Sequence, residues 1–295
     1  MRILRDDRVF ALLLLAPAIL CVLGLVGWPI AQIIGFSFVE GAKLNALGGG
    51  ARPLGFGNFI SVLTDPETWD SVVTTAIYVA GATLPAFALG LGAALLLNRS
   101  FPLRRALRCL ALLPWAAPGV LVSIIFLWLF DPSYGVVNYL LRSFGYHGED
   151  IAWYSNENTA LAAAILPTIW KGFPFFALTI LGALQTIPAD LYEAADIDGA
   201  NRTQAFFNVT WPGVRGPALL ALVLNGLWAL REFDIIFATT GGGPSRASET
   251  LGIRAYLEAF SYYDLGRAAA IGVLTLAIAL ALLAVARRPL QKEFF

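Results

Sequence analysis

The sequence predicts an all-α integral membrane protein with six transmembrane helices, organised as a single domain over residues 1–295. Two observations lead to this fold class. Hydrophobic residues make up 58% of the chain and charged residues 14%, whereas soluble domains average about 45–50% and about 25%. The apolar residues also gather into stretches of about 20 or more, which is the length of helix that a bilayer requires.

The six predicted spans run, in order, over Val9–Phe38, Val72–Leu97, Ala106–Phe130, Asn158–Ile187, Pro217–Ala238 and Gly266–Ala286. The first follows three arginines, as the apolar region of a signal peptide does, but it is too long for one and we interpret it as a retained helix. Several spans exceed the minimum length, which permits tilt, and the candidate kink sites are Pro17, Pro85, Pro118, Pro167 and Pro174.

The distribution of basic residues predicts the orientation, because short cytosolic loops hold an excess of Lys and Arg. With the N-terminus inside, twelve basic residues fall on the cytosolic side: Arg2, Arg5, Arg8, Arg99, Arg104, Arg105, Arg108, Arg202, Arg215, Arg287, Arg288 and Lys292. Five fall outside: Lys43, Arg52, Arg142, Arg246 and Arg254. Both termini are therefore expected in the cytosol. The formal net charge of zero gives no indication of a nucleic-acid partner.

The cytosolic loop 188–216 is too long for a simple turn. Pro188 suits a helix start, and Gly199 can take the left-handed conformation that ends a helix. Asn201 then has the character of an N-cap, with Gln204 three residues later in capping-box register. We expect a short helix, a turn and a second short helix lying at the membrane surface.

Part of this loop, Tyr192-Glu-Ala-Ala-Asp-Ile-Asp-Gly-Ala200, closely resembles the EAA loop of binding-protein-dependent ABC importer permeases in its carbohydrate-uptake form. Leu113-Pro-Trp-Ala-Ala-Pro118 and the segments 130–138 and 233–244 also look like maltose- and glycerol-phosphate-type sugar permeases. Thr240-Gly-Gly-Gly-Pro244 resembles the first of the two permeases in such systems. Unlike the larger maltose subunit, this chain is expected to lack an extra N-terminal helix pair and a large periplasmic insertion.

The resemblance implies a type I ABC importer transmembrane domain in the bacterial cytoplasmic (inner) membrane. A coupling helix would seat in a groove of an ATPase subunit, and its residues are Glu193, Ala194, Ala195, Asp196, Asp198, Gly199 and Ala200. Small alanines allow close approach of a partner, and carboxylates suit its Arg or Lys side chains. The implied partners are a second homologous permease, two ATPase subunits, a periplasmic or lipid-anchored sugar-binding protein, a sugar substrate and membrane lipid.

Neither catalysis nor metal binding is expected of this chain. It contains no G-x-x-x-x-G-K-[ST] phosphate loop, so ATP and Mg are expected on the partner ATPase and no cofactor on this chain. Cys21 and Cys109 lie in or beside apolar segments, and their spacing indicates neither a disulfide framework nor a zinc site.

A sugar path needs polar and aromatic groups inside the helix bundle, because hydroxyls lose water only where new hydrogen bonds replace it. The candidates are Trp170, Lys171, Asn225, Trp228, Glu232 and Asp234. Charges within a membrane are costly and are therefore functional hypotheses by default. The alternative is that Lys171 snorkels or pairs with a carboxylate. Helix-end charges at the outer interface would then be Arg231, Glu232 and Asp234.

Three other functions are compatible with a membrane protein of this size. An ion-coupled secondary transporter often has inverted repeats and buried ionisable groups near the midplane, whereas here the charges cluster toward the ends of the spans. A membrane enzyme would need a catalytic or metal-ligand spacing, and the lone His147 supplies none. An amino-acid or peptide permease of the same family is disfavoured because the sequences of segments 192–200 and 240–244 resemble those of sugar permeases.

Overall fold

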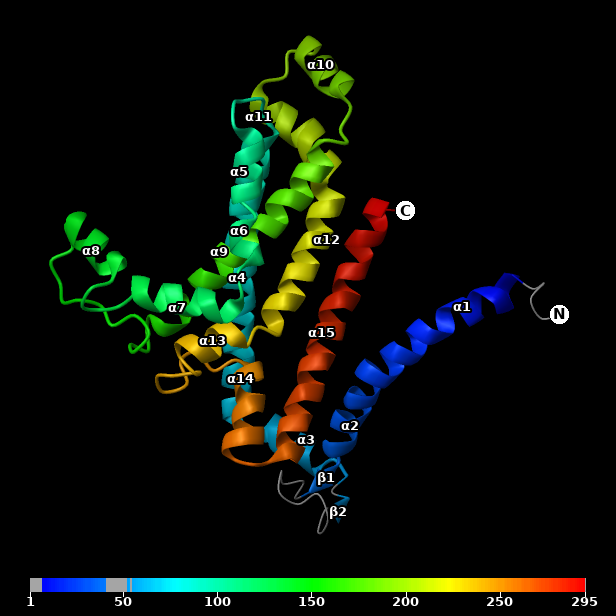
Figure 1. Ribbon diagram of the computed structural model, residues 1–295, viewed down its shortest axis with the longest axis vertical. Coiled ribbons are helices and arrows are strands. Elements are labelled where there is room, and N and C mark those ends of the chain that lie inside the picture. The colour runs from blue at the N-terminus through cyan, green and yellow to red at the C-terminus, as the bar shows by residue number, and fades with distance from the viewer. Residues whose placement is uncertain (1–6, 41–51, 54, 295) are drawn as a thin grey trace. The chain divides into compact units, whose positions relative to one another are not determined.

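The computed structural model describes residues 7–40, 52–53 and 55–294, and nearly all of its regular structure is helical (Figure 1). Arg2, Arg5 and Lys43, which entered the prediction of orientation, lie outside the described residues. Five of the described helices are long and apolar enough to cross a membrane, or six if one sharply bent pair counts as a single span. The all-α membrane fold predicted from the sequence is therefore confirmed. The chain divides into two compact units, residues 1–68 with 254–276 and residues 69–253 with 277–295.

The described part of the smaller unit, residues 1–68 with 254–276, begins with one long helix that contains a π-helical turn. Its elements are α1 (Asp7–Val22), the π-turn η2 (Leu23–Gly27), α2 (Trp28–Phe36), the paired two-residue strands β1 (Val39–Glu40) and β2 (Arg52–Pro53), α3 (Gly57–Thr64), η4 (Leu257–Ser261) and parts of α14 (Leu251–Tyr256) and α15 (Leu265–Phe294). The apolar stretch Leu14–Phe36 has no buried residue. A helix that is apolar all round and buries nothing within its own chain suits lipid or another membrane subunit.

A cluster of ionised side chains joins the α3–α4 junction to the turn before α15 within this unit. Arg254 is only 4% exposed, and its Nη2 donates to Asp65 at 2.5 Å and to Glu67 at 3.3 Å. Arg267 also donates to Asp65, and its Nε lies 2.9 Å from Glu258. Because Arg254 is buried, its charge is tolerated only while these carboxylates surround it.

Two carboxyl groups of this cluster, those of Asp65 and Glu258, have pKa values shifted in opposite directions. Burial opposes ionisation of Asp65, but the Glu67 backbone N–H and the guanidinium groups of Arg254 and Arg267 outweigh it and hold the pKa of Asp65 below its ordinary value. Burial raises the pKa of Glu258, although Arg267 and Arg254 act against that rise. Ionised Asp65 therefore stabilises the fold, whereas ionisation of Glu258 costs stability.

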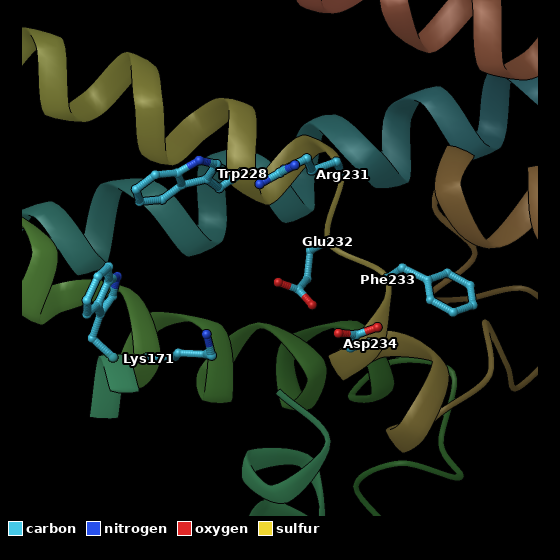
Figure 2. A pocket seen from close by; sticks show the side chains of 7 residues that line it. Lys171, Trp228, Arg231, Glu232, Phe233 and Asp234 are labelled. Atoms are coloured by element: carbon cyan, nitrogen blue, oxygen red, sulfur yellow. The ribbon is translucent and has the colours of Figure 1, made fainter. Parts of the chain in front are cut away.

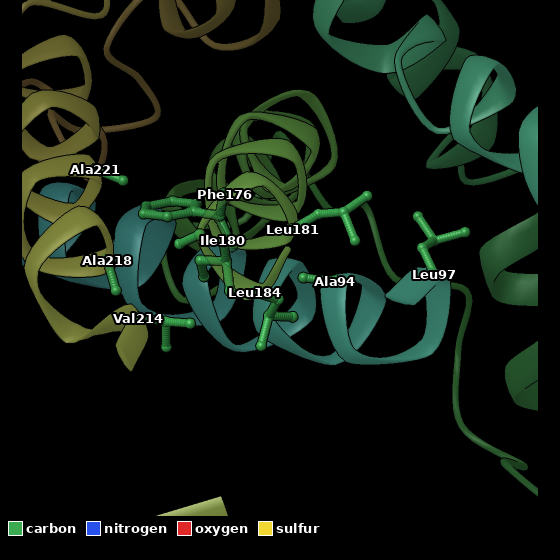
Figure 3. Close-up of a cluster of buried hydrophobic side chains, with 11 residues drawn as sticks. Ala94, Leu97, Phe176, Ile180, Leu181, Leu184, Val214, Ala218 and Ala221 are labelled. Atoms are coloured by element: carbon green, nitrogen blue, oxygen red, sulfur yellow. The ribbon is translucent and has the colours of Figure 1, made fainter. Parts of the chain in front are cut away.

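The larger unit, residues 69–253 with 277–295, contains the other spans. Its elements are α4 (Pro66–Asn98, from Trp69), α5 (Arg104–Leu110), α6 (Leu113–Ala116), α7 (Gly119–Leu129), α8 (Val136–Ser143), α9 (Ala160–Leu184), α10 (Ala189–Ile197), α11 (Arg202–Ala205), the π-turn η3 (Phe206–Thr210), α12 (Trp211–Leu230), α13 (Asp234–Thr239) and the remaining parts of α14 and α15. Three of these helices, α4, α9 and α12, enclose its buried core (Figure 3).

That core is built largely from small residues, which let the helices approach closely. Ala86 and Ala94 of α4 and Ala218 and Ala221 of α12 share this core with the larger Phe176 of α9. Such residues are typical of helix contacts in membranes, where van der Waals packing replaces the hydrophobic effect as the main attraction. The Phe87 ring of α4 meets Phe176 edge-on at 5.6 Å between centroids.

The closest approach in this core is made by a glycine. A side-chain carbon at Gly90 of α4 would lie 2.3 Å from Cβ of Phe176 and 2.8 Å from the carbonyl oxygen of Phe173. Contacts that short do not occur between real side chains, so α4 and α9 pack at this distance only because position 90 has no Cβ. Further along the same pair of helices, Tyr78 and Thr168 share a hydrogen bond of 2.5 Å.

The predicted third span, 106–130, does not form one straight helix. The segments Arg104–Ala116 and Gly119–Leu129 meet at an angle of 96° around Ala117 and Pro118. Both residues have extended backbone, with ψ of 133° and 137°. A proline disfavours the helical conformation of the residue before it, which explains why the chain turns here rather than bending gently.

The predicted fifth span, 217–238, also differs from the structure. Its helix begins earlier, since α11, η3 and α12 are continuous from Arg202 to Leu230. The expected second short helix is thus the first turn of a long one. In η3 the hydrogen bonds lengthen to the i→i−5 pattern directly before Trp211-Pro212, as they do in η2 before Trp28-Pro29. A π-turn makes room for the proline ring that an α-helix would not accommodate.

Gly90→Ala is expected to lower the free energy of unfolding by about 1–3 kcal/mol, because the new methyl group forces α4 away from α9. Gly92→Ala is the matched control, since a Cβ there meets nothing within 4 Å. It should leave stability unchanged or slightly raised, because alanine favours the helix. Thermal unfolding of the two purified variants in one detergent measures the difference, and an equal midpoint for both would contradict the close packing.

Asp65→Asn is expected to cost about 3 kcal/mol at neutral pH, because two guanidinium groups lose their shared carboxylate. The lowered pKa means that the stabilisation from Asp65 is complete above about pH 4 and is lost as the pH falls through that lowered value. The variant should therefore lose part of the acid-dependent destabilisation of the wild type. The exposed Asp70→Asn serves as the control, and matching unfolding curves of the two variants across pH 3–7 would refute the assignment.

Candidate functional site

A polar pocket of about 450 Å³ lies within the larger unit, where α12 ends and α13 begins. Its lining residues are Trp115, Lys171, Trp228, Arg231, Glu232, Phe233 and Asp234. A second hollow of about 80 Å³ shares Trp115, Lys171, Trp228 and Glu232 with it and adds Thr168, Gly172, Asn225 and Ala229. Because they share four lining residues, the two hollows adjoin, and we call them together the polar pocket.

The break between α12 and α13 supplies most of the charge of the pocket. Arg231, Glu232 and Phe233 lie outside any helix. An oxygen of the Glu232 carboxylate accepts a hydrogen bond of 3.2 Å from the backbone N–H of Ile235, so this side chain satisfies the first turn of α13. The broken helix is thus stabilised by one of the side chains that line the pocket.

Lys171 projects from α9 toward the same region (Figure 2). Figure 2 places the carboxylates of Glu232 and Asp234 on the side of the loop that faces Lys171, whereas the Phe233 ring turns away from them. The Glu232 carboxylate is attracted by Lys171 and Arg231 and repelled by Asp234. Charges of both signs therefore line a space that is open to a ligand.

Aromatic rings form the other wall of the pocket. The Trp228 ring of α12 packs against Phe175 of α9, with centroids 4.8 Å apart. Trp115 comes from α6, which ends two residues before the 96° bend. Indole rings held beside charged and amide groups can stack on the apolar face of a ligand while the polar groups bind its hydroxyls.

Five of the six residues expected along a substrate path line this polar pocket: Lys171, Asn225, Trp228, Glu232 and Asp234. Asn225 is 8% exposed and lies opposite Gly172 across the α9–α12 contact. Trp170 does not line the pocket. Its ring instead meets Phe126 of α7 at 6.0 Å, because successive residues of a helix point about 100° apart.

Sequence reasoning missed Trp115, Arg231, Phe233 and Thr168 as lining residues. Trp115 had one usable signal, since it stands between two prolines within an apolar stretch, where a break in the helix could be suspected. Arg231 and Phe233 flank Glu232 and reach the pocket only because α12 stops at Leu230. Nothing in the local sequence marks that helix end with a proline or glycine.

The segment 188–200 has the geometry of a compact surface helix with a sharp end. Gly199 has φ of +76°. Its N–H donates to the backbone carbonyl oxygen of Asp196 at 3.1 Å, and the N–H of Ala200 donates to that of Ala195 at 2.9 Å. This is the Schellman arrangement that ends helices, and it requires a residue that tolerates the left-handed conformation. The expectation from the sequence that Gly199 closes the helix agrees with this geometry.

The next helix begins with a capping box. The Asn201 side chain accepts from the Gln204 N–H at 2.9 Å, and the Gln204 side chain accepts from the Asn201 N–H at 2.8 Å. Tyr192 of α10 shares a hydrogen bond of 3.0 Å with Thr210 of η3. The capping box stabilises the start of α11, and the Tyr192–Thr210 bond fastens α10 to the long helix that continues into α12.

The predicted coupling residues divide between two faces of α10. Ala194, Ala195, Asp198, Gly199 and Ala200 line a groove of about 410 Å³ between α10 and the α11–η3 segment. Glu193 and Asp196 are exposed on the helix. Ile197 is 87% exposed, an unusual position for a large apolar side chain that sequence reasoning did not single out. A helix with acidic and apolar side chains on its outer face is suited to contact another protein.

Comparison with known proteins identifies the family. The model of the family described as "Binding-protein-dependent transport system inner membrane component" matches residues 86–291. The chain belongs to this family. One relative is a sulfoquinovosyl glycerol transport system permease protein of Agrobacterium fabrum, which is 39% identical over 97% of this chain and 92% of the relative. Another is a trehalose/maltose transport system permease protein of Thermococcus litoralis, 36% identical over 77% of this chain and 76% of the relative.

Solved structures agree on the fold. A bacterial alginate ABC transporter in complex with an alginate pentasaccharide-bound periplasmic protein contains a chain with a TM-score of 0.79 to this one. The two are 23% identical, and the match covers 98% of this chain and 97% of the other. A methionine ABC transporter chain gives a TM-score of 0.55 at 18% identity over 78% of this chain.

Family membership settles the class of the protein. It is a membrane-embedded permease subunit of an ABC importer, and the ATPase of such a system is a separate subunit. The prediction that this chain is a transport subunit and not an enzyme is confirmed. Nothing in the comparisons supports the ion-coupled alternative.

Proposed function

We propose that this permease conducts a sugar or a glycosylated polyol through the polar pocket. The observation that carries the proposal is the combination in one space of two tryptophan rings, Trp115 and Trp228, with Lys171, Asn225 and Glu232. Aromatic faces suit the apolar side of a pyranose, and the polar groups replace water at its hydroxyls. Names of relatives that refer to sulfoquinovosyl glycerol and to trehalose or maltose support the same substrate class.

The proposed assembly contains this chain, a second homologous permease, two ATPase subunits that bind ATP and Mg, and an extracytoplasmic sugar-binding protein. Both termini and α10 lie in the cytosol, in agreement with the excess of Lys and Arg in the predicted cytosolic segments. We infer that α10 seats in the ATPase through Glu193, Asp196 and Ile197, while Ala194 and Ala195 allow close approach. Gly199 and Ala200 then end the helix sharply at the rim of the contact.

This arrangement gives a physical route from ATP to the pocket. A displacement of α10 is passed to the long helix through the short connection at Gly199 and Ala200 and through the Tyr192–Thr210 hydrogen bond. The same helix continues without interruption to Leu230, beside Trp228 and Glu232. Movement at the cytosolic end therefore changes the width of the pocket at the other end.

Replacing pocket residues is expected to lower uptake without affecting insertion. Trp228→Leu and Lys171→Met should each reduce the initial rate at least about fivefold, since a lost charged hydrogen bond or aromatic contact costs about 1–3 kcal/mol. Trp170→Leu should stay within about twofold of wild type. The measurement is uptake of radiolabelled trehalose, maltose and sulfoquinovosyl glycerol by a deletion strain of the native host carrying each variant at equal membrane abundance.

Equal losses in Trp170→Leu and Trp228→Leu would show that the pocket is not the path. Failure of the wild-type chain to restore uptake of any sugar or glycosylated polyol, although it restored uptake of another nutrient, would overturn the substrate class.

Gly199→Val is expected to reduce uptake strongly and Gly199→Asn only mildly. A Cβ at this position meets nothing within 4 Å, so the difference arises from the backbone: φ of +76° costs a β-branched residue about 1–2 kcal/mol, whereas asparagine tolerates it. Both variants should insert normally. ATPase activity of the purified complex would be measured beside uptake, and full activity of the valine variant in both assays would refute the coupling role.

A further inference from the structure

The hairpin between α4 and α5 concentrates positive charge that the proposed transport function does not use. Arg99, Arg104 and Arg105 are all exposed, and the sequence contains no Asp or Glu between Asp70 and Asp131. No carboxylate of the hairpin or of either helix beyond Asp70 can therefore neutralise these three side chains, which we call the arginine trio.

The hairpin is held in place by contacts that leave the arginine trio outside. Arg108, in the last turn of α5, donates from Nη2 to the carbonyl oxygen of Leu97 at 2.9 Å, which fastens α5 to the end of α4. Phe101, between the two helices, packs against the buried core cluster. The trio is thus presented by a fixed turn, at the end of the larger unit where α11 also lies (Figure 1).

An exposed apolar stripe lies beside the trio on the same turn and helix. Leu103 is 78% exposed, and Leu107 and Leu110 are also exposed. Leu107 and Leu110 are three residues apart and share one face of α5, and Leu103 stands directly before its first turn. In a chain embedded in a membrane, such a stripe is at the depth of the lipid acyl chains, and arginines at its end are at the depth of the headgroups.

We propose that this hairpin is a binding site for anionic phospholipid. Along the membrane normal, the acyl chains of a phospholipid would lie beside the leucine stripe and its phosphate beside the arginine trio. Guanidinium groups bind phosphate oxygens in a paired geometry, and an additional anionic headgroup supplies net charge that a zwitterionic lipid does not. Leu103, at φ of 67°, turns the chain so that the stripe and the trio adjoin.

The test uses the purified full chain in nanodiscs of phosphatidylcholine that contain phosphatidylglycerol with a photoactivatable headgroup. Labelling should map by mass spectrometry to residues 96–110. Because each basic residue near an anionic surface contributes roughly a fivefold gain in affinity, Arg99→Gln/Arg104→Gln/Arg105→Gln should reduce labelling at least about tenfold. Raising the ionic strength should weaken labelling of the wild type.

Arg287→Gln/Arg288→Gln, which removes two exposed arginines near the end of α15, is the matched control and should leave labelling of residues 96–110 within about twofold. An equal loss in the control would show a general surface-charge effect and overturn the proposal. Equal labelling by photoactivatable phosphatidylcholine would overturn it as well, as would full competition by free glycerol phosphate. Unchanged thermal unfolding of the triple variant excludes misfolding as the cause of lost labelling.

Discussion

The contact between α4 and α9 at Gly90 is the constraint on which the larger unit depends. A bilayer offers little hydrophobic drive for helices to associate, so their attraction comes from close packing. The missing side chain at position 90 lets Phe176 fill the space between α4, α9 and α12. This packing fixes α9 against α12, and that in turn sets Lys171 opposite Trp228. The polar pocket is therefore a consequence of how tightly an apolar core can close.

Two helix interruptions convert this core into a site. Backbone groups that leave a helix within a membrane must find other partners. At the second interruption Glu232 provides one by accepting from Ile235, and at the first Pro118 has no N–H to satisfy. The same interruptions bring Trp115 and the charged 231–234 segment to the pocket. Local stability and a polar surface inside the membrane are thus provided by the same residues.

Much of this organisation could be predicted from the sequence, and the reasons are physical. Long apolar stretches determine spans regardless of context, and the 188–204 segment has strong local signals in Pro188, Gly199 and the Asn201–Gln204 pair. The ion cluster could not be foreseen, because Asp65 and Arg254 lie 189 positions apart. The pocket was predicted only in part. Residue type makes both Trp170 and Lys171 candidates, but only packing decides which of two neighbouring helical residues faces the pocket.

The unbroken run from Arg202 to Leu230 has a mechanical consequence. Its 29 residues amount to a rod about 43 Å long at the usual rise of an α-helix, and a tilt of about 5° at one end displaces the other by roughly 4 Å. That displacement is comparable to the width of a hydroxyl group with its hydrogen bond. Helices commonly kink at π-helical turns, so bending at η3, near the base of this helix, would reduce the displacement that reaches Leu230.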